Sequence, residues 1–211
     1  MIARDGVRML SAAVMTGALL AAPISLPFAA AESCPDSEVV FARGSGQPVG
    51  LGDVGQAFVD ALKSQVPGRS IDAYPVNYPA THDYRNSALV GEGDATTHIQ
   101  TMVATCPNTK LVLGGYSQGA SVMELSSNSM PAPVVNHVAA VVLFGPPTSG
   151  YSSSLWGGPL PVLATAYRPK SIDFCIPDDI ICAEGGNMVA HLMYTQNGSP
   201  DQAATFAASR L

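Results

Sequence analysis

Residues 110–125 read Lys-Leu-Val-Leu-Gly-Gly-Tyr-Ser-Gln-Gly-Ala-Ser-Val-Met-Glu-Leu and carry the strongest local signal in the chain. Residues 111–113 form an aliphatic run without alternation, which is typical of a strand buried on both faces of a parallel sheet. Residues 120–125 predict a helix. Between the two, residues 115–119 fit Gly-x-Ser-x-Gly, the pattern of a tight strand-to-helix turn that exposes a serine oxygen.

The chemistry of this turn makes Ser117 a candidate nucleophile. Residues that flank such a turn must be small because the backbones of strand and helix approach closely. The helix N-terminus also places backbone N–H groups and a partial positive charge beside the serine. A glycine-rich turn with an ordinary serine is the alternative, but the strand before it and the helix after it favour the catalytic interpretation.

Strand-like runs alternate with helical segments in the rest of the chain. An apolar residue at every fourth position predicts a helix over residues 53–66. The other expected elements are a helix at about 94–105 and strands at 38–42, 71–78, 110–116, 138–144 and 171–176. This alternation predicts an α/β fold, a three-layer α/β/α sandwich around a mainly parallel sheet.

The N-terminal 31 residues have the layout of a secretory signal peptide. A positively charged start precedes an apolar run over residues 9–22, and the small residues 29–31 predict cleavage after Ala31. A membrane anchor is the alternative, but the run is shorter than the roughly 20 residues of a spanning helix, and Pro23 and Pro27 interrupt the segment after it. We therefore expect a secreted protein, extracellular or associated with the cell envelope, without stable insertion into a membrane.

Composition limits the remaining classes. The 211 residues are 47% hydrophobic and 12% charged, which is too apolar for a disordered chain and suits one domain over residues 32–211. The net charge is −6 and the basic residues are scattered, so nucleic acid is not expected as a partner. No feature suggests an obligate dimer, and we expect a monomer.

The chain has four cysteines, all beyond the expected cleavage site: Cys34, Cys106, Cys175 and Cys182. An even number in an oxidising compartment favours two disulfides. Spacing alone does not choose among the three pairings, although loop lengths mildly favour a short Cys175–Cys182 link and a long-range Cys34–Cys106 link. A metal site is the alternative, but the sequence lacks close-spaced Cys and His pairs.

A nucleophilic serine needs a base oriented by a carboxylate, and in this fold type the chain order is serine, acid, histidine. Only His137 and His191 follow Ser117. Between Ser117 and His137 the only acidic residue is Glu124, on the expected nucleophile helix, so we interpret His137 as a surface or helix-end residue. His191 follows a glycine-rich loop with three aspartates upstream and is the candidate base.

The three upstream aspartates are the candidate acids. Asp173 is expected within a strand. Asp178 and Asp179 lie between Cys175 and Cys182, where a disulfide could fix a carboxylate. Spacing alone does not separate these two.

An oxyanion hole requires two N–H donors. One is normally the residue after the nucleophile, here Gln118, and the other comes from an early loop after a strand. Residues 43–46, Arg-Gly-Ser-Gly, follow the first expected strand and supply such a loop. A flexible turn without a role is the alternative.

Three motifs together resemble the cutinase family, and most closely its actinobacterial cutinase-like members. They are Phe-Ala-Arg-Gly-Ser at 41–45, Gly-Tyr-Ser-Gln-Gly at 115–119, and Cys175-x3-Asp179-x2-Cys182 followed by His191. The resemblance extends from about Cys34 to Leu211. It implies a lid-less α/β-hydrolase fold with a five-stranded, mainly parallel sheet.

The resemblance also implies roles for particular residues. It makes Asp179 the triad acid with Ser117 and His191, pairs Cys34 with Cys106 and Cys175 with Cys182, and makes Ser45 and Gln118 the oxyanion donors, with the Ser45 hydroxyl as a third. Position 178 carries Asp where fungal members usually have Gly. A second carboxylate at that position could compete for the role or raise the pKa of its neighbour.

The expected activity is hydrolysis of short- to medium-chain carboxylic esters through an acyl-enzyme, without a metal or organic cofactor. One alternative is a lipase or phospholipase that contacts a lipid surface and acts on envelope or host lipids, and an alcohol could replace water as the acyl acceptor. Another is a secreted binding protein without turnover, against which the complete set of Ser, Asp and His argues.

Substrate length is less constrained by the sequence. Five apolar residues could line an acyl crevice or equally serve the core: Leu155, Trp156, Leu160, Val162 and Leu163. Residues 145–161 are rich in Gly, Pro and Ser, which predicts a mobile rim.

Overall fold

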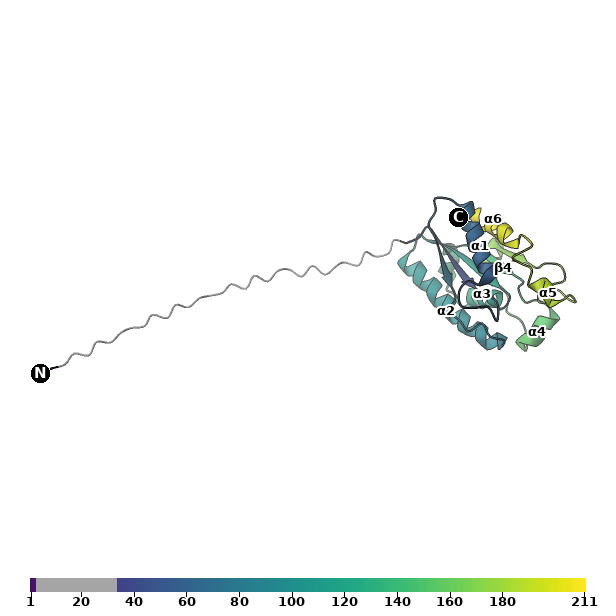
Figure 1. Ribbon diagram of the computed structural model, residues 1–211, viewed down its shortest axis with the longest axis horizontal. Helices are drawn as coiled ribbons and strands as arrows, with labels where there is room; N and C mark the ends of the chain where they lie inside the picture. The colour runs from purple at the N-terminus through teal and green to yellow at the C-terminus, as the bar shows by residue number, and fades with distance from the viewer. Residues whose placement is uncertain (3–33) are drawn as a thin grey trace. The chain divides into compact units, whose positions relative to one another are not determined.

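The structure is a computed structural model that describes residues 1–2 and 34–211 (Figure 1). The predicted signal peptide, residues 1–31, therefore lies almost entirely outside the described residues. No helix in the described part of the chain is both long and apolar enough to cross a membrane.

A single five-stranded sheet in the order β2-β1-β3-β4-β5 forms the centre of the fold. Its strands are β1 (Ser37–Ala42), β2 (Ile71–Pro75), β3 (Lys110–Tyr116), β4 (Val138–Phe144) and β5 (Ser171–Phe174). Every neighbouring pair of strands is parallel, so the sheet is entirely parallel, where the sequence predicted a mainly parallel one. The central strands have unbroken apolar sequences because helices cover both faces of the sheet.

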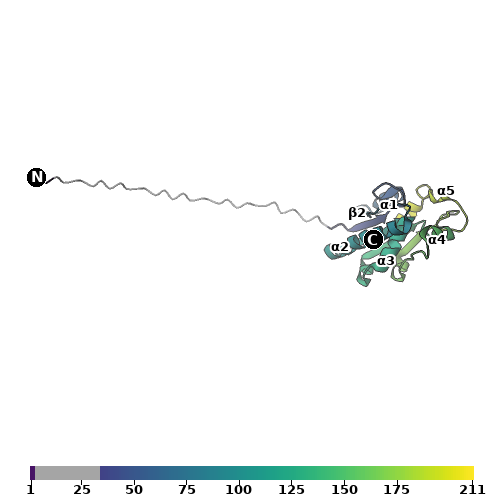
Figure 2. The same ribbon diagram turned by 90° about the horizontal axis from the view of Figure 1, so that it is seen from below.

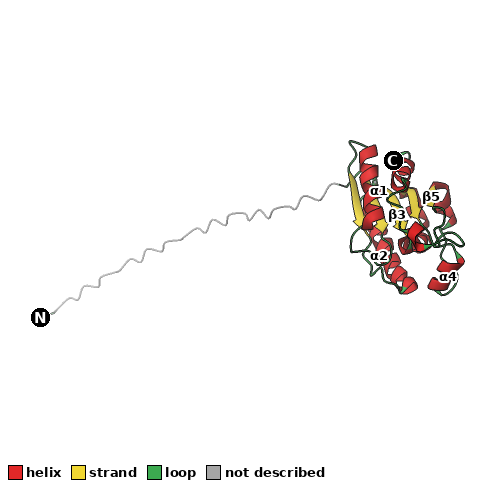
Figure 3. Cartoon of the chain, turned by 45° about the vertical axis from the view of Figure 1, so that its right-hand side comes forward, coloured by secondary structure: helices red, strands yellow, loops and turns green. Residues whose placement is uncertain are grey.

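Two helical layers bury the two faces (Figures 2 and 3). On one side, α1 (Gly52–Gln65) packs beside α6 (Ser199–Ala208) over an aromatic cluster around Phe41. On the other side, α2 (Tyr84–Thr105) packs against α3 (Gln118–Ser129) over Leu113 and Leu143. This is the predicted three-layer α/β/α sandwich.

Several boundaries differ from those predicted. Helix α2 begins ten residues earlier than predicted. The prediction missed its first half because that part has no apolar stripe. It packs closely against α3 through Gly91, where a Cβ would lie 2.8 Å from the Val122 side chain. Strand β2 ends at Pro75 rather than at residue 78, and β5 ends at Phe174 rather than at residue 176. Helix α3 runs from Gln118 to Ser129, beyond the predicted 120–125.

The segment expected to be a mobile rim contains a helix that was not predicted. Helix α4 spans Gly150–Trp156, and the side chain of Ser149 accepts a hydrogen bond from the Ser152 N–H as its N-cap. The serines that suggested a loop instead begin and line a short helix. Helix α6 and three more short helices were also not predicted: η1 (Ala132–His137), η2 (Thr165–Lys170) and α5 (Met188–His191).

Candidate active site

Ser117 occupies the sharp turn between β3 and α3. Its φ of 56° and ψ of −120° are a strained conformation for a residue other than glycine. A Cβ on Gly119 would lie 1.9 Å from the Ala42 carbonyl oxygen, and one on Gly115 would lie 2.3 Å from the Gly119 carbonyl oxygen. The two glycines of the motif are thus required by backbone contacts, and they let β1, β3 and α3 converge below Ser117.

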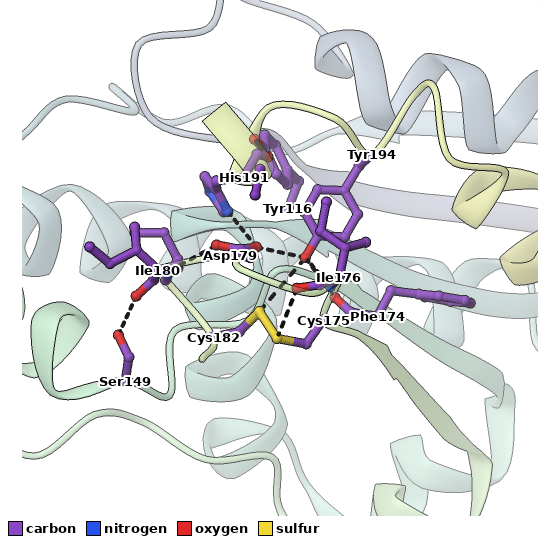
Figure 4. Close-up of polar contacts among 12 residues, drawn as sticks. Tyr116, Ser149, Phe174, Cys175, Ile176, Asp179, Ile180, Cys182, His191 and Tyr194 are labelled. Carbon is purple, nitrogen blue, oxygen red and sulfur yellow. Dashed lines mark hydrogen bonds and ion pairs between the residues drawn. A yellow bond between two sulfur atoms is a disulfide. The ribbon is translucent and has the colours of Figure 1, made fainter. Parts of the chain in front are cut away.

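His191 ends α5 and pairs with Asp179 (Figure 4). The His191 Nδ1 atom lies 2.8 Å from Asp179 Oδ2, and the Asp179 side chain is fully buried. A carboxylate only accepts hydrogen bonds, so Nδ1 must carry the proton and Nε2 is left as an acceptor. Nε2 is buried and has no hydrogen-bond partner among the described residues.

Asp179 is held by two further donors. The Tyr194 hydroxyl donates to Oδ2 at 2.7 Å, and the Ile181 N–H donates to Oδ1 at 2.8 Å. Burial on its own would raise the pKa of Asp179, but the hydrogen bonds from His191 and Tyr194 outweigh it and hold the pKa below its ordinary value. The residue beside the imidazole is therefore a carboxylate at neutral pH.

The sequence did not indicate three residues that hold the imidazole. Tyr116 stacks on His191 with ring centroids 4.9 Å apart, and its hydroxyl donates to the His191 carbonyl at 2.7 Å. Tyr194 meets the same ring edge-on. Gly145 has a φ of +51°, and a Cβ there would lie 2.7 Å from the imidazole, so no other residue fits. Its position at the carboxyl end of β4 was the one available signal.

Within the loop of residues 175–182, the two neighbouring aspartates point in different directions. Cys175 and Cys182 form a disulfide that closes it, and Cys34 pairs with Cys106. Asp178 has a φ of +64° and is exposed, whereas the next residue, Asp179, points inward to the imidazole. These are the pairs and the aspartate that the resemblance implies. Asp173 lies in β5, as expected, and His137 ends η1 as a helix-end residue.

The two expected oxyanion donors come from different segments of the chain. Gln118 is the first residue of α3, and Ser45 lies in the loop after β1. Neither N–H has a hydrogen-bond partner among the residues that the structure describes. The Ser45 loop is fixed by other groups: Arg43 Nε donates to the Gln47 carbonyl at 3.0 Å, and the Gly46 N–H donates to the Ala80 carbonyl at 2.7 Å.

Two hollows meet at Ser117. A narrow slot of about 20 Å³ runs along α3 and α4, and a wider groove of about 320 Å³ contains Ser45 and His191. The five apolar residues considered for an acyl crevice do not all line it. Leu155, Trp156 and Leu160 line the slot, Val162 is exposed, and Leu163 packs in the core.

The sequence model of the Cutinase family matches residues 33–211. The chain belongs to the cutinase family. A relative named Carboxylesterase Culp1, from Mycobacterium tuberculosis, is 57% identical over 100% of this chain and 98% of its own. Phospholipase Culp4 from the same organism is 43% identical over 99% and 93% of the two chains. A solved structure of Trichoderma reesei cutinase in complex with a phosphonate inhibitor is 33% identical, with a TM-score of 0.68 over 83% of this chain and 76% of that one.

The two disulfides of this cutinase-family chain are expected to differ in effect. Replacing Cys34 and Cys106 with serine should lower the free energy of unfolding by about 4 kcal/mol, because the closed loop is long, and should leave kcat for an ester unchanged. Replacing Cys175 and Cys182 should cost only about 2.5 kcal/mol but lower kcat about tenfold or more, because that loop positions Asp179. Urea unfolding and ester hydrolysis measure the two effects, and an equal loss of kcat in both variants would contradict this division.

Tyr194 should stabilise the fold in a pH-dependent manner. Tyr194→Phe removes a donor to a buried carboxylate, so the free energy of unfolding at pH about 7 should fall by about 1.5–3 kcal/mol. The folded-state pKa of Asp179 is lowered, so this contribution is present above the unfolded pKa of about 3.9 and is lost as pH falls through the folded value. The difference between wild type and variant should therefore shrink in urea unfolding at pH about 3.

Tyr167→Phe is the matched control for that measurement. Tyr167 is as buried as Tyr194, but its hydroxyl has no partner among the described residues. Its removal should change stability little at either pH. A Tyr194→Phe deficit that is equal at both pH values would show that Asp179 is not the group it stabilises.

Proposed function

We propose that Ser117, His191 and Asp179 form the catalytic triad of a carboxylesterase for short- to medium-chain esters, with Ser45 and Gln118 as oxyanion donors. As a cutinase-family member, the protein is a serine carboxylic ester hydrolase that takes ester substrates. One observation carries the assignment of residues: a buried carboxylate holds His191 at Nδ1, its Nε2 has no partner among the described residues, and His191 and Ser117 line the same groove.

The reaction follows from these positions. The Ser117 oxygen attacks the ester carbonyl carbon as His191 Nε2 takes its proton, and Asp179 stabilises the resulting imidazolium. The negative oxygen of the tetrahedral intermediate is then stabilised by the free N–H groups of Ser45 and Gln118. His191 gives the proton to the departing alcohol, which leaves an acyl-serine. Water, activated by the same histidine, hydrolyses the acyl-serine and releases the acid.

The two hollows indicate which half of the ester lies where. The leaving alcohol must be protonated by His191, and His191 lines the wide groove but not the slot. We therefore place the alcohol in the groove and the acyl chain in the slot beside Leu155 and Leu160. Because the slot is narrow, it should accept a short or medium acyl chain best.

The acyl-length preference is tested with 4-nitrophenyl esters of increasing chain length. We expect kcat/KM to be highest between about two and eight acyl carbons and to fall for longer chains, since these must leave the slot. A maximum at sixteen or more carbons would contradict the proposed use of the slot. Emulsified triglyceride and phospholipid vesicles are included in the same series.

Lipid hydrolysis is the second candidate activity, and a surface feature favours testing it. Exposed apolar side chains stand on and after α5, at the rim of the groove: Met188, Val189, Leu192 and Met193. The similar protein Culp4 is named a phospholipase. Faster hydrolysis of vesicle phospholipid than of soluble esters would replace the first proposal with this one.

Export and a monomeric state are part of the proposal. The two disulfides support an oxidising compartment. We propose that residues 1–31 are removed and that the domain acts as a monomer outside the cell or at its envelope.

A further inference from the structure

Helix α3 places a second serine one turn after the candidate nucleophile. Ser121 is fully buried, and its hydroxyl oxygen has no hydrogen-bond partner among the described residues. A serine inside a helix commonly donates to the carbonyl four residues earlier. Ser126 of the same helix does so, with its hydroxyl 2.9 Å from the Val122 carbonyl. The Ser121 hydroxyl is left unpaired at a position where an unpaired group costs stability.

Ser121 is one of the residues that line the acyl slot. The wall is otherwise formed mainly by apolar side chains, such as Pro147, Leu155 and Trp156. Ser152 also lines it, but its hydroxyl is used because it donates to the Ile181 carbonyl at 2.7 Å. Ser121 therefore combines a place in the slot lining, about one helical turn from Ser117, with a hydroxyl that has no partner among the described residues.

A second unpaired atom lies on the same side of α3. The Gln118 side chain donates from Nε2 to the carbonyls of Thr81 and Tyr84 at 2.9 and 3.0 Å, which fixes the orientation of its amide. Its Oε1 is buried without a partner among the described residues, and Gln118 also lines the slot. Residues three apart on a helix are neighbours, so Gln118 and Ser121 present an acceptor and a hydroxyl together. A hydroxyl group, which both donates and accepts, matches that pair.

The spacing limits where such a hydroxyl can stand on an acyl chain. Ser117 immediately precedes α3, and the helical rise of about 1.5 Å per residue places Ser121 about 6 Å further along the helix axis. With carbon–carbon bonds of about 1.5 Å and a hydrogen bond of about 2.8 Å, an oxygen on the second or third acyl carbon reaches Ser121 when the first is bonded to Ser117. An oxygen on a more distant carbon lies beyond hydrogen-bond reach of the Ser121 hydroxyl.

We propose that Ser121, together with Gln118, gives the slot a preference for acyl groups that carry a hydroxyl on the second or third carbon. The inference rests on the proposed function, because it requires the acyl group in the slot. A plain alkyl chain leaves the Ser121 hydroxyl and the Gln118 Oε1 unpaired, whereas the hydroxyl of a hydroxyacyl chain can bond to them.

The test compares kcat/KM for the 4-nitrophenyl esters of butanoate, 2-hydroxybutanoate and 3-hydroxybutanoate. We expect the ratio of a hydroxylated ester to butanoate to fall about 3- to 10-fold in Ser121→Ala for one or both positions. Differences in intrinsic reactivity among the esters cancel, because each ratio is compared between proteins. Ser126→Ala is the matched control: its hydroxyl is buried in the same helix but bonded, and the ratios should not change.

The outcomes distinguish this inference from the function on which it rests. If wild type hydrolyses all three esters and Ser121→Ala leaves both ratios within twofold, the slot preference is wrong and the esterase stands. If wild type hydrolyses none of them, the proposed function fails and the preference with it. Thermal unfolding should show Ser121→Ala at least as stable as wild type, because it loses an unpaired hydroxyl. If that variant does not fold, Ser121→Cys, which keeps the side-chain shape at a somewhat larger volume and weakens the donor, provides the same comparison.

Discussion

Replacing Ser117 with alanine is expected to lower kcat for ester hydrolysis on the order of 10⁶-fold while the fold persists. Without the hydroxyl no acyl-enzyme forms, and the N–H groups of Ser45 and Gln118 can act only on direct attack by water. Ser117 already has a positive φ at this turn, so alanine adds no new backbone strain. Initial rates with 4-nitrophenyl butanoate at high protein concentration measure the residual activity.

Ser126→Ala is the control for this loss as well. It removes a buried hydroxyl from the same helix and should retain the wild-type rate. A Ser117→Ala protein that is folded and retains more than about one per cent of the rate would show that the nucleophile is another group.

Asp179→Asn is expected to lower kcat about 10⁴-fold. Both carboxylate oxygens accept hydrogen bonds, Oδ1 from the Ile181 N–H and Oδ2 from His191 and Tyr194. An amide group must turn its NH₂ toward one of these donors. Turned toward His191, it forces the imidazole into the tautomer with the proton on Nε2, which cannot take a proton from Ser117.

Asp178→Asn tests the same claim from the neighbouring position. Asp178 is exposed and has no contact with the imidazole, so its replacement should change kcat less than about twofold. The measurement is kcat for butanoate with both variants side by side. A larger loss for Asp178→Asn than for Asp179→Asn would contradict the assignment of the acid.

The sequence predicted the centre of the fold better than its periphery. Strands β3 and β4 have the predicted bounds, because unbroken aliphatic runs are buried on both faces and nothing competes with that pattern. The first half of α2 was missed because Gly91 is there for close packing, which has no local signature. Helices α4 and α5 are too short for a periodicity to emerge from their sequences.

Some features of the site could likewise be predicted from the sequence, and others could not. The turn around Ser117 was predictable because its glycines follow from local steric demands. Asp178 and Asp179 are chemically identical neighbours that differ in backbone conformation, so spacing could not choose between them. The roles of Tyr194 and Gly145 depend on contacts between segments that are far apart in the chain. The unpaired state of the Ser121 hydroxyl depends on the absence of a hydrogen-bond partner among the described residues, which sequence cannot indicate.

The central claim is that Ser117 is an activated nucleophile, and covalent labelling tests it most directly. Diethyl 4-nitrophenyl phosphate should release about one nitrophenolate per protein molecule, leave a diethylphosphoryl group on Ser117 in the peptide mass spectrum, and abolish ester hydrolysis in proportion to labelling. Asp179→Asn should react much more slowly. A label on another residue, or full loss of activity without a label on Ser117, would contradict the account.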